Sequence, residues 1–339
     1  MRILVLSDLW LPFPGGAERY MRNMVLELIK RGHEIEVLTS YEPAQNETQF
    51  KLTYISIPVY AQHQKGRDII WNKVQSFMPR LIITHHFFAG EFAEIFKDDW
   101  IAVPAVEVIH SRIRNPHSKL AVFNSYSTAN MPGQLRMPQD MVILPMADPD
   151  TKADSHGEYC GHLKPIGGKG IMMTYALAKR FPKRKFLVLR GEWQGAETMI
   201  SGCPNIEYME PVKDIRDFYK HCRLLLMPSE REEAGTVPFE ATLNGIPCIS
   251  SDVMGLPETN RGGIILPINN RPWDNIMPLH PDMESIARWE DEINKLDNPA
   301  YYNEVVQRQR DFMASVPWSG LYDEFSSKLE EVVRNHRPV

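Results

Sequence analysis

The stretch that decides the fold runs from Pro228 to Glu258 and reads PSEREEAGTVPFEATLNGIPCISSDVMGLPE. It directly follows the apolar run Leu224–Met227, which predicts a buried parallel strand. A second short strand is predicted at Ile246–Ser250. The charged residues between the two strands therefore lie at the carboxyl end of the first strand, the edge where open α/β sheets bind ligands.

Two glutamates of this stretch suggest a binding site. Glu232 and Glu240 are eight positions apart, with Gly235 between them and a short helix predicted over Phe239–Asn244. A glycine lets backbone N–H groups approach a ligand, and a helix start offers unpaired donors to an anion. Such a turn suits a ligand with a phosphate in the middle and hydroxyls at both ends, which is the layout of a nucleotide sugar. The alternative is a solvated acidic loop beside a helix surface.

A second glycine-rich stretch, Gly161–Gly170, reads GHLKPIGGKG. It lies between a strand predicted over residues 158–163 and a helix predicted over Ile171–Arg180. Backbone N–H groups together with the movable cation of Lys169 suit a diphosphate. The alternative is a flexible turn with a surface lysine.

Composition sets limits on the class of protein. The chain has 339 residues, which suits two domains of roughly 150 residues each. Hydrophobic residues make up 43%, and no apolar run approaches the ~18 residues of a membrane span. The first residues lead straight into a strand without a signal-peptide pattern, so we expect a cytoplasmic protein. The net charge of −5 argues against nucleic-acid binding and leaves local docking on anionic lipid open.

The first half of the chain begins with a βαβ pattern: a strand over Arg2–Ser7, a helix over Ala17–Arg31 and a strand over Glu34–Thr39. The first loop lacks the three spaced glycines of a dinucleotide fingerprint. Instead, Gly15 and Gly16 directly precede the helix, where free N–H groups suit a phosphate or a sugar. The pair is also compatible with a plain turn.

Histidines follow two later strands of this half. The strand Leu81–Thr84 ends at His85-His86, and the strand Ile101–Ile109 ends at His110. A histidine after a strand suits a metal site, a catalytic base or packing. No carboxylate or cysteine stands at ligand spacing, so a metal is the least favoured of these. Likewise, Asp148-Pro149-Asp150 lies in a proline-rich linker and is interpreted as turn chemistry.

The second half repeats the strand and helix alternation, which predicts a second parallel sheet. Three helices follow it, the last an amphipathic one over Ser319–Arg334. We expect domains over residues 1–147 and 148–315 and a terminal helix over residues 316–339. Four cysteines without a C-x-x-C pair predict reduced, mostly buried thiols, at Cys160, Cys203, Cys222 and Cys248.

The chain resembles the retaining glycosyltransferases of family four, which carry two glutamates separated by seven residues. The matching positions are Ser229, Glu232, Gly235, Val237, Glu240 and Ala241, whereas Glu233 and Ala234 replace a usual glycine and phenylalanine. The resemblance implies an α/β protein of the GT-B fold, with two Rossmann-like parallel-sheet domains facing a cleft. It implies transfer of a hexosyl unit from a UDP- or GDP-sugar to an acceptor hydroxyl, without a metal or other cofactor. It also implies that the terminal helix crosses back onto the first domain.

The resemblance also assigns roles to residues. Glu232 would hold donor-sugar hydroxyls, Glu240 the ribose hydroxyls, and Lys169 the diphosphate. The family's usual arginine is replaced by His162, which could itself stabilise the charge of the diphosphate when protonated; otherwise Arg190 or Lys164 could supply that charge. Further contacts to the donor are implied for His85, His110, Gly15, Gly16 and the N–H groups of Gly235, Thr236 and Val237.

Several functions remain open at this stage. An epimerase or a phosphorylase on the same fold would use similar loops, and an inverting transferase would need a base, for which Asp8 is the candidate beside the glycine pair. A non-catalytic nucleotide-sugar-binding protein is the other alternative. The acceptor, whether a saccharide, a lipid-linked sugar or a small molecule, is not readable from the variable stretch Tyr41–Arg80.

Overall fold

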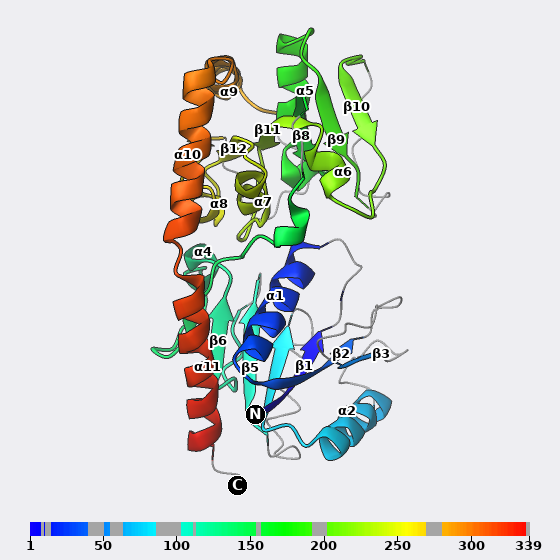
Figure 1. The fold of residues 1–339 in the computed structure, drawn as a ribbon, viewed down its shortest axis with the longest axis vertical. Helices are drawn as coiled ribbons and strands as arrows, with labels where there is room; N and C mark the ends of the chain where they lie inside the picture. The colour runs from blue at the N-terminus through cyan, green and yellow to red at the C-terminus, as the bar shows by residue number, and fades with distance from the viewer. Residues whose placement is uncertain are drawn as a thin grey trace. The chain divides into compact units, whose positions relative to one another are not determined.

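The computed structural model describes residues 1–7, 10, 15–39, 51–54, 64–85, 103–110, 113–153, 157–191, 202–268 and 280–336. The chain folds into two compact units, Met1–Leu144 with Pro317–Val339 and Pro145–Val316. Each unit is built around its own parallel sheet with helices packed on both faces (Figure 1). None of the described helices is both long enough and apolar enough to cross a membrane.

Unit 1 contains a seven-stranded parallel sheet in the order β3-β2-β1-β4-β5-β6-β7. Its strands are β1 (Arg2–Ser7), β2 (Glu34–Thr39), β3 (Lys51–Tyr54), β4 (Leu81–His85), β5 (Ala105–Ile109), β6 (Leu120–Phe123) and β7 (Met141–Val142). The described helices are α1 (Gly16–Lys30), α2 (Gln64–Phe77), α4 (Tyr126–Ala129) and α11 (Trp318–Asn335).

Alternation along β1 distributes its side chains to the two faces of this sheet. Ile3 and Val5 join a buried cluster with residues of α1 and α11, while Leu4 and Leu6 pack with residues of α2. Gly32 adopts a φ of 80° directly after α1, and the N–H of His33 then bonds to the carbonyl of Leu28 at 3.2 Å. This left-handed turn ends the helix and leads the chain into β2.

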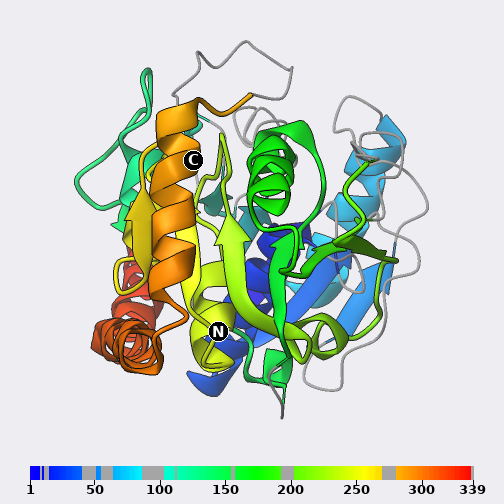
Figure 2. The ribbon, with the colours of Figure 1, turned by 90° about the horizontal axis from the view of Figure 1, so that it is seen from above.

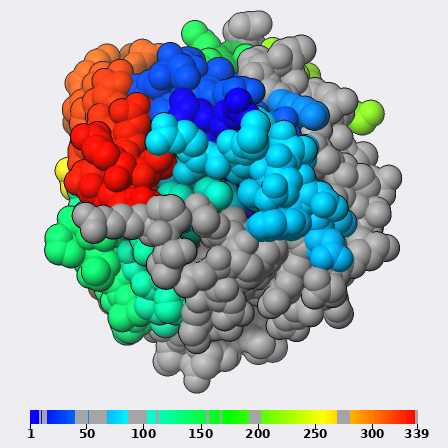
Figure 3. Space-filling view, turned by 90° about the horizontal axis from the view of Figure 1, so that it is seen from below, coloured from blue at the N-terminus to red at the C-terminus, as the bar shows by residue number. Residues whose placement is uncertain are grey.

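Helix α11 is the last element of the chain and packs in unit 1. Trp318 Nε1 donates to the carbonyl of Leu144 at 3.1 Å, and Arg31 Nε donates to Asp323 at 2.9 Å. Figure 3 shows the red C-terminal helix beside the blue N-terminal part of the chain. Phe325 and Leu329 are fully buried against the sheet cluster, so α11 completes the core of unit 1.

Unit 2 contains a six-stranded parallel sheet in the order β10-β9-β8-β11-β12-β13. Its strands are β8 (Tyr159–Leu163), β9 (Phe186–Leu189), β10 (Ile206–Met209), β11 (Cys222–Met227), β12 (Cys248–Ser251) and β13 (Ile264–Leu266). The helices are the 3-10 turns η1 (Pro149–Thr151) and η2 (Gly167–Lys169), α5 (Ile171–Arg180), α6 (Arg216–Tyr219), α7 (Val237–Leu243), α8 (Leu256–Thr259), α9 (Met283–Lys295) and α10 (Pro299–Ser315).

The chain of unit 2 enters its sheet in the middle. From β8 it proceeds outward to β9 and β10, then crosses to β11 on the other side of β8. The point between β8 and β11 is therefore a topological switch point, where loops diverge and open a binding crevice at the carboxyl edge. Figure 2 shows α5 and α9 on the same face of this sheet, and their residues share one buried cluster.

Most predicted elements are present, and their ends shift by a few residues. The strand expected over Ile101–Ile109 begins only at Ala105. Two elements of unit 2, α8 and β13, had not been predicted. The four cysteines are free and buried, as the sequence indicated, and Asp148 accepts the N–H of Asp150 at 3.0 Å in a turn.

Candidate active site

Two loops meet at the switch point of unit 2, one after β8 and one after β11. The carbonyl of Gly168 accepts the N–H groups of Glu230 at 3.0 Å and Arg231 at 3.3 Å. Gly170 has a φ of 73°, and a Cβ added there would lie 1.8 Å from the carbonyl oxygen of Pro228. Only glycine allows this close backbone approach, so Gly170 is required for the two loops to pack against each other.

Lys169 and Glu232 form an ion pair across these loops. The Lys169 side chain is 28% exposed and that of Glu232 is 13% exposed, so solvent reaches part of this ion pair. The two glycine-flanked stretches of the sequence are thus brought into direct contact. An anion placed here would meet the Lys169 ammonium, and it would compete with Glu232 for that charge.

The residue that precedes α8, Gly255, contacts the backbone around Glu232. The N–H of Gly255 donates to the carbonyl of Glu232 at 3.1 Å. A Cβ at Gly255 would lie 2.0 Å from the carbonyl of Glu233, so this contact too requires glycine. Gly235 follows in the loop, and Thr236 and Val237 begin α7 without a side-chain cap on the helix.

Glu240 lies in the first turn of α7 and is only 5% exposed. Its Oε2 accepts a hydrogen bond from the hydroxyl of Tyr219, a fully buried residue of α6. Asn244 donates to the carbonyl of Glu240 at 2.8 Å and binds the linker through Thr151 and Ala153. Glu240 is therefore a positioned, buried carboxylate and not the solvated helix residue of the alternative interpretation.

His162 provides no cation at neutral pH. Its side chain is buried within β8, and Nδ1 shares a hydrogen bond of 2.9 Å with Thr174 Oγ1. Burial lowers the pKa of His162 to about 4; a backbone contact with Lys164 opposes the shift and the charge of Lys169 adds to it. The imidazole is thus neutral, and the expected contribution of His162 to phosphate charge is not supported by its surroundings.

Arg190 lies just beyond β9 at the same edge of the sheet. Its Nη1 pairs with Glu210 Oε1 at 2.6 Å, and Glu210 is 69% exposed. An ion pair with such an exposed carboxylate is weak. Arg190 therefore remains the arginine that could turn to a phosphate at this edge.

Unit 1 carries a hydrogen-bonded row of side chains along the carboxyl edge of its own sheet. Ser7 Oγ lies 2.9 Å from His85 Nδ1, and His85 Nε2 lies 2.9 Å from His110 Nε2. His110 Nδ1 lies 3.0 Å from Asn124 Nδ2. The row spans β1, β4, β5 and β6. His85 is fully buried and His110 half-buried, so His110 is the outer member of the pair.

The remaining candidates of unit 1 lie around this row. Gly15 caps α1 in an extended conformation without a side-chain bond, and Gly16 is exposed at the first helical position. Asp8 and His86 lie outside the described residues. Within the part of the chain that the structure describes, no group of three or more His, Cys, Asp or Glu side chains is arranged to hold a metal ion.

Sequence reasoning missed three residues of these sites: Tyr219, Ser7 and Asn124. Tyr219 lies in the short helix α6, where a buried tyrosine is an ordinary core residue. Its partner Glu240 is 21 positions away, and nothing in the spacing links the two. The end of the predicted strand Arg2–Ser7 did place Ser7 at the carboxyl edge, but nothing in the sequence indicated that Ser7 or Asn124 bonds to a histidine.

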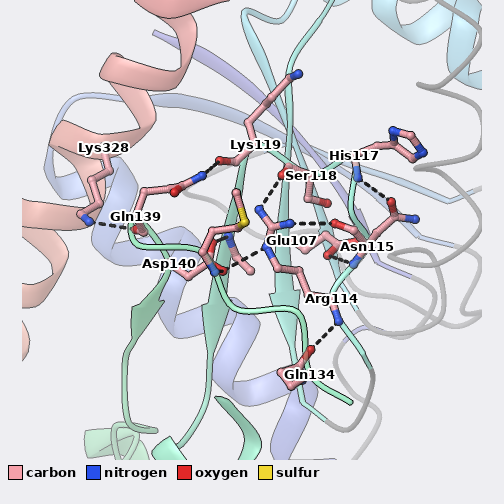
Figure 4. A network of polar contacts seen from close by, with 12 residues as sticks. Glu107, Arg114, Asn115, His117, Ser118, Lys119, Gln134, Gln139, Asp140 and Lys328 are labelled. Carbon is pink, nitrogen blue, oxygen red and sulfur yellow. Dashed lines mark hydrogen bonds and ion pairs between the residues drawn. The ribbon is translucent and has the colours of Figure 1, made fainter. Parts of the chain in front are cut away.

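Away from these sites, unit 1 buries a carboxyl group in a polar network (Figure 4). Glu107 of β5 accepts the N–H of Asn115 at 2.9 Å, beside a buried ion pair of 3.0 Å between Arg114 and Asp140. Burial raises the pKa of Glu107 to about 7, although Asn115, Ser118 and Arg114 each oppose the shift.

Solved structures with this fold extend over nearly the whole chain. Sucrose-phosphate synthase from Thermosynechococcus elongatus is similar with a TM-score of 0.76 and 13% identity, covering 98% of this chain and 100% of that chain. Anabaena HepE, in complex with UDP-glucose, is similar with a TM-score of 0.71 and 14% identity, covering 98% of this chain and 99% of that chain. The catalytic domain of Arabidopsis thaliana Starch Synthase IV, bound to ADP and acarbose, is similar with a TM-score of 0.68 and 12% identity, covering 98% of this chain and 99% of that chain. These likenesses define the GT-B fold.

Sequence comparison defines the family. Residues 14–132 match the family model described as Glycosyltransferase Family 4, and residues 159–274 match the model described as Glycosyl transferases group 1. The chain therefore belongs to the glycosyltransferases, with one of these domains in each unit. No curated protein sequence matches it.

Proposed function

We propose that the enzyme transfers a hexosyl unit from a nucleoside-diphosphate sugar, UDP- or GDP-linked, to an acceptor hydroxyl with retention of the anomeric configuration. The observation that carries this proposal is the contact between Lys169 and Glu232 at the switch point of unit 2, with the buried carboxylate of Glu240 eight residues further along. A cation and two carboxylates at one sheet edge suit a diphosphate with hydroxyl-bearing groups at each end.

Departure of the nucleoside diphosphate is the costly event, because negative charge develops on its phosphates while the sugar becomes oxocarbenium-like. Lys169 and the N–H groups of Gly235, Thr236 and Val237 would stabilise that charge. Each such donor is typically worth about 3 kcal/mol of barrier. Since His162 is neutral, Arg190 is the second cation that we assign to the phosphates.

The carboxylates orient the donor. Glu240 accepts hydrogen bonds from the ribose hydroxyls, a role that acidic side chains fill at nucleotide sites. When the diphosphate binds, Lys169 pairs with it and its ion pair with Glu232 breaks. Glu232 then accepts hydrogen bonds from hydroxyls of the donor sugar. In unit 1, Gly15, Gly16, His85 and His110 are proposed to contact the sugar or the acceptor, which is a saccharide, a lipid-linked sugar or a small molecule. No metal takes part in this scheme.

The first experiment is a thermal-shift screen with UDP-, GDP- and ADP-sugars, followed by transfer assays with the donor that stabilises the protein. NMR of the product then establishes the anomer: retention supports the proposal, and inversion points to a base such as Asp8. Donor that is isomerised without acceptor would identify an epimerase. Turnover should survive EDTA, and an activity restored only by added metal would contradict the metal-free scheme.

Variants test the site itself. Glu240→Gln should mainly weaken nucleotide binding, because the amide cannot accept from both ribose hydroxyls as well as from Tyr219. Lys169→Ala should mainly depress single-turnover rates. Lys220→Ala, which removes an exposed lysine of the same unit paired with Asp217, is the matched control. Unchanged nucleotide binding and turnover in both site variants would refute the assignment.

A further inference from the structure

A cavity of unit 2 lies at the opposite edge of its sheet from Lys169 and Glu232. It has a volume of about 490 Å³ and is lined by residues 180–185 together with Glu158. Glu158 directly precedes β8 and Lys185 directly precedes β9, so the cavity is at the amino edge, whereas the candidate active site is at the carboxyl edge. The volume falls in the range of small-molecule sites.

The turn that lines this cavity is strongly basic. Five of the seven residues 179–185, KRFPKRK, are lysine or arginine, in a chain whose net charge is −5. The cavity itself is lined by four of these cations and by one carboxylate, Glu158. A concave surface with this excess of positive charge concentrates anions.

The turn between α5 and β9 (Figure 1) is fixed before any ligand binds. Asn205 Nδ2 donates to the carbonyls of Ala178, Phe181 and Arg184, each at 3.0 Å. The Arg184 guanidinium lies 5.1 Å from the centre of the Phe181 ring and pairs with Asp297 at 2.7 Å. A pre-organised turn loses little conformational entropy on binding, so its cations can act together on one ligand.

The cations of the cavity are not all neutralised. Within the described part of the chain, Lys183 makes no ion pair. Arg180 approaches Glu290 only to 3.8 Å, beyond hydrogen-bond distance. Lys185 pairs with Glu158, whose side chain is 65% exposed, and such a pair contributes little. Arg180, Lys183 and Lys185 can therefore exchange solvent or a weak partner for an anionic ligand.

We propose that this cavity binds a small molecule with at least two phosphate groups. Two phosphates suit the site because the available cations extend from Arg180 at the end of α5 through Lys183 to Lys185 before β9, so that more than one anionic group can be paired. Phosphate suits the arginine, whose planar fork binds two of its oxygens at once. The site is separate from the donor site, so occupancy of one leaves the other open.

Calorimetric titration with fructose 1,6-bisphosphate at low salt tests this proposal. The wild-type protein should bind the probe, more weakly as salt is added, and glucose 6-phosphate should bind about tenfold more weakly, since one set of charge-assisted hydrogen bonds is lost. The double variant Arg180→Glu/Lys183→Glu should lose about tenfold or more in affinity for the bisphosphate. The double variant Lys213→Glu/Lys220→Glu reverses two exposed lysines of the same unit, so it is the charge-matched control and should bind as the wild type does.

Two further arms separate the alternatives. Lys169→Ala should keep bisphosphate binding, and UDP should bind equally to the wild type and to the double variant; loss of the probe in Lys169→Ala would place it in the donor site and overturn the proposal. Absence of bisphosphate binding, or binding unaffected by the charge reversals, would overturn it too. Sedimentation with phosphatidylglycerol vesicles that depends on Arg180 and Lys183, without bisphosphate binding, would instead identify a lipid headgroup as the ligand.

Discussion

At the scale of single residues, the position of the Glu240 carboxylate depends on its hydrogen bond with the Tyr219 hydroxyl. Tyr219→Phe removes the hydrogen bond to Glu240 Oε2 while the buried ring keeps its packing. A hydrogen bond to a charged group is typically worth about 1.5 to 3 kcal/mol, so we expect UDP or GDP to bind more weakly by about tenfold or more. Turnover at saturating donor should change little. Calorimetry and steady-state kinetics measure the two effects.

A matched control exists in the same unit. The Tyr301 hydroxyl donates to Glu292 Oε2 at 2.7 Å on α10 and α9, so Tyr301→Phe removes the same kind of bond away from the nucleotide residues. Equal losses of nucleotide affinity in the two variants would show that the effect of Tyr219 is a general weakening of unit 2.

The ion pair of Lys169 leads to a prediction of opposite sign for Glu232. Glu232→Gln releases the lysine from its carboxylate, so free UDP or GDP should bind more tightly, by about threefold to tenfold for a partly exposed pair worth about 1 kcal/mol. Transfer should nevertheless slow, because the donor sugar loses its charged acceptor. Calorimetry and single-turnover assays test this; weaker binding of the free nucleotide would mean that the pair does not compete with phosphate.

These residues differ in how far they could be predicted. Lys169 directly precedes Gly170, a glycine that the close approach to the Pro228 carbonyl requires, so the glycine-rich sequence marks its place. The glycine that approaches the backbone beside Glu232 is Gly255, which is distant in the sequence. His162 is misleading for a physical reason: the strand that carries it is buried, and burial removes the charge that a histidine in a glycine-rich stretch suggests. Nothing in the sequence indicates the role of Tyr219, because its hydrogen bond with Glu240 joins two short helices, α6 and α7.

At the scale of elements, periodicity predicted long segments and failed for short ones. β13 has three residues after two glycines, too few for an alternating pattern. The four-residue helix α8 is likewise too short for a periodic pattern, and it begins at Leu256, where the following proline is favourable near the first helical position. The consequence concerns the site, since Gly255 at the start of α8 bonds to the backbone of Glu232.

Helix α11 gives a stability prediction for unit 1. Phe325 is fully buried in the cluster that α11 shares with α1 and the sheet. Phe325→Ala should lower the free energy of unfolding of unit 1 by about 3 to 5 kcal/mol, the usual range for a phenylalanine removed from a core. Urea denaturation measures it, with the exposed Glu331→Ala on the same helix as control. A loss no larger than that of the control would mean that α11 does not complete this core.

At the scale of the whole molecule, the first six strands of unit 1 follow the same order as the six strands of unit 2, with the chain entering each sheet at the third position and crossing over later. This order places Ser7 and His85 in unit 1, and Lys169 and Glu232 in unit 2, at corresponding switch points. The alternation of the sequence predicted two such sheets. It could not predict which polar side chains each one buries, because burial depends on neighbours distant in the chain.

Those buried groups make the two units respond oppositely to pH. The pKa of His162 is about 4 in unit 2, below its ordinary value of 6.5, so its contribution to stability is present above pH 6.5 and is lost as the pH falls toward 4. The pKa of Glu107 is about 7 in unit 1, above its ordinary 4.5, so its contribution is present below pH 4.5 and is lost as the pH rises through 7. Each shift corresponds to at most about 3 kcal/mol.

Hydrogen exchange measured by mass spectrometry can follow the two units separately in one sample. Between pH 5 and 8, after correction for intrinsic exchange, protection of β5 in unit 1 should fall and protection of β8 in unit 2 should rise. Glu107→Gln should remove the fall in β5, because the amide stays neutral and still accepts the N–H of Asn115. Glu34→Gln, which changes an exposed carboxylate of the same sheet, should leave the fall in protection of β5 unchanged. Parallel pH dependence of β5 and β8, unchanged in Glu107→Gln, would show that neither buried group governs the stability of its unit.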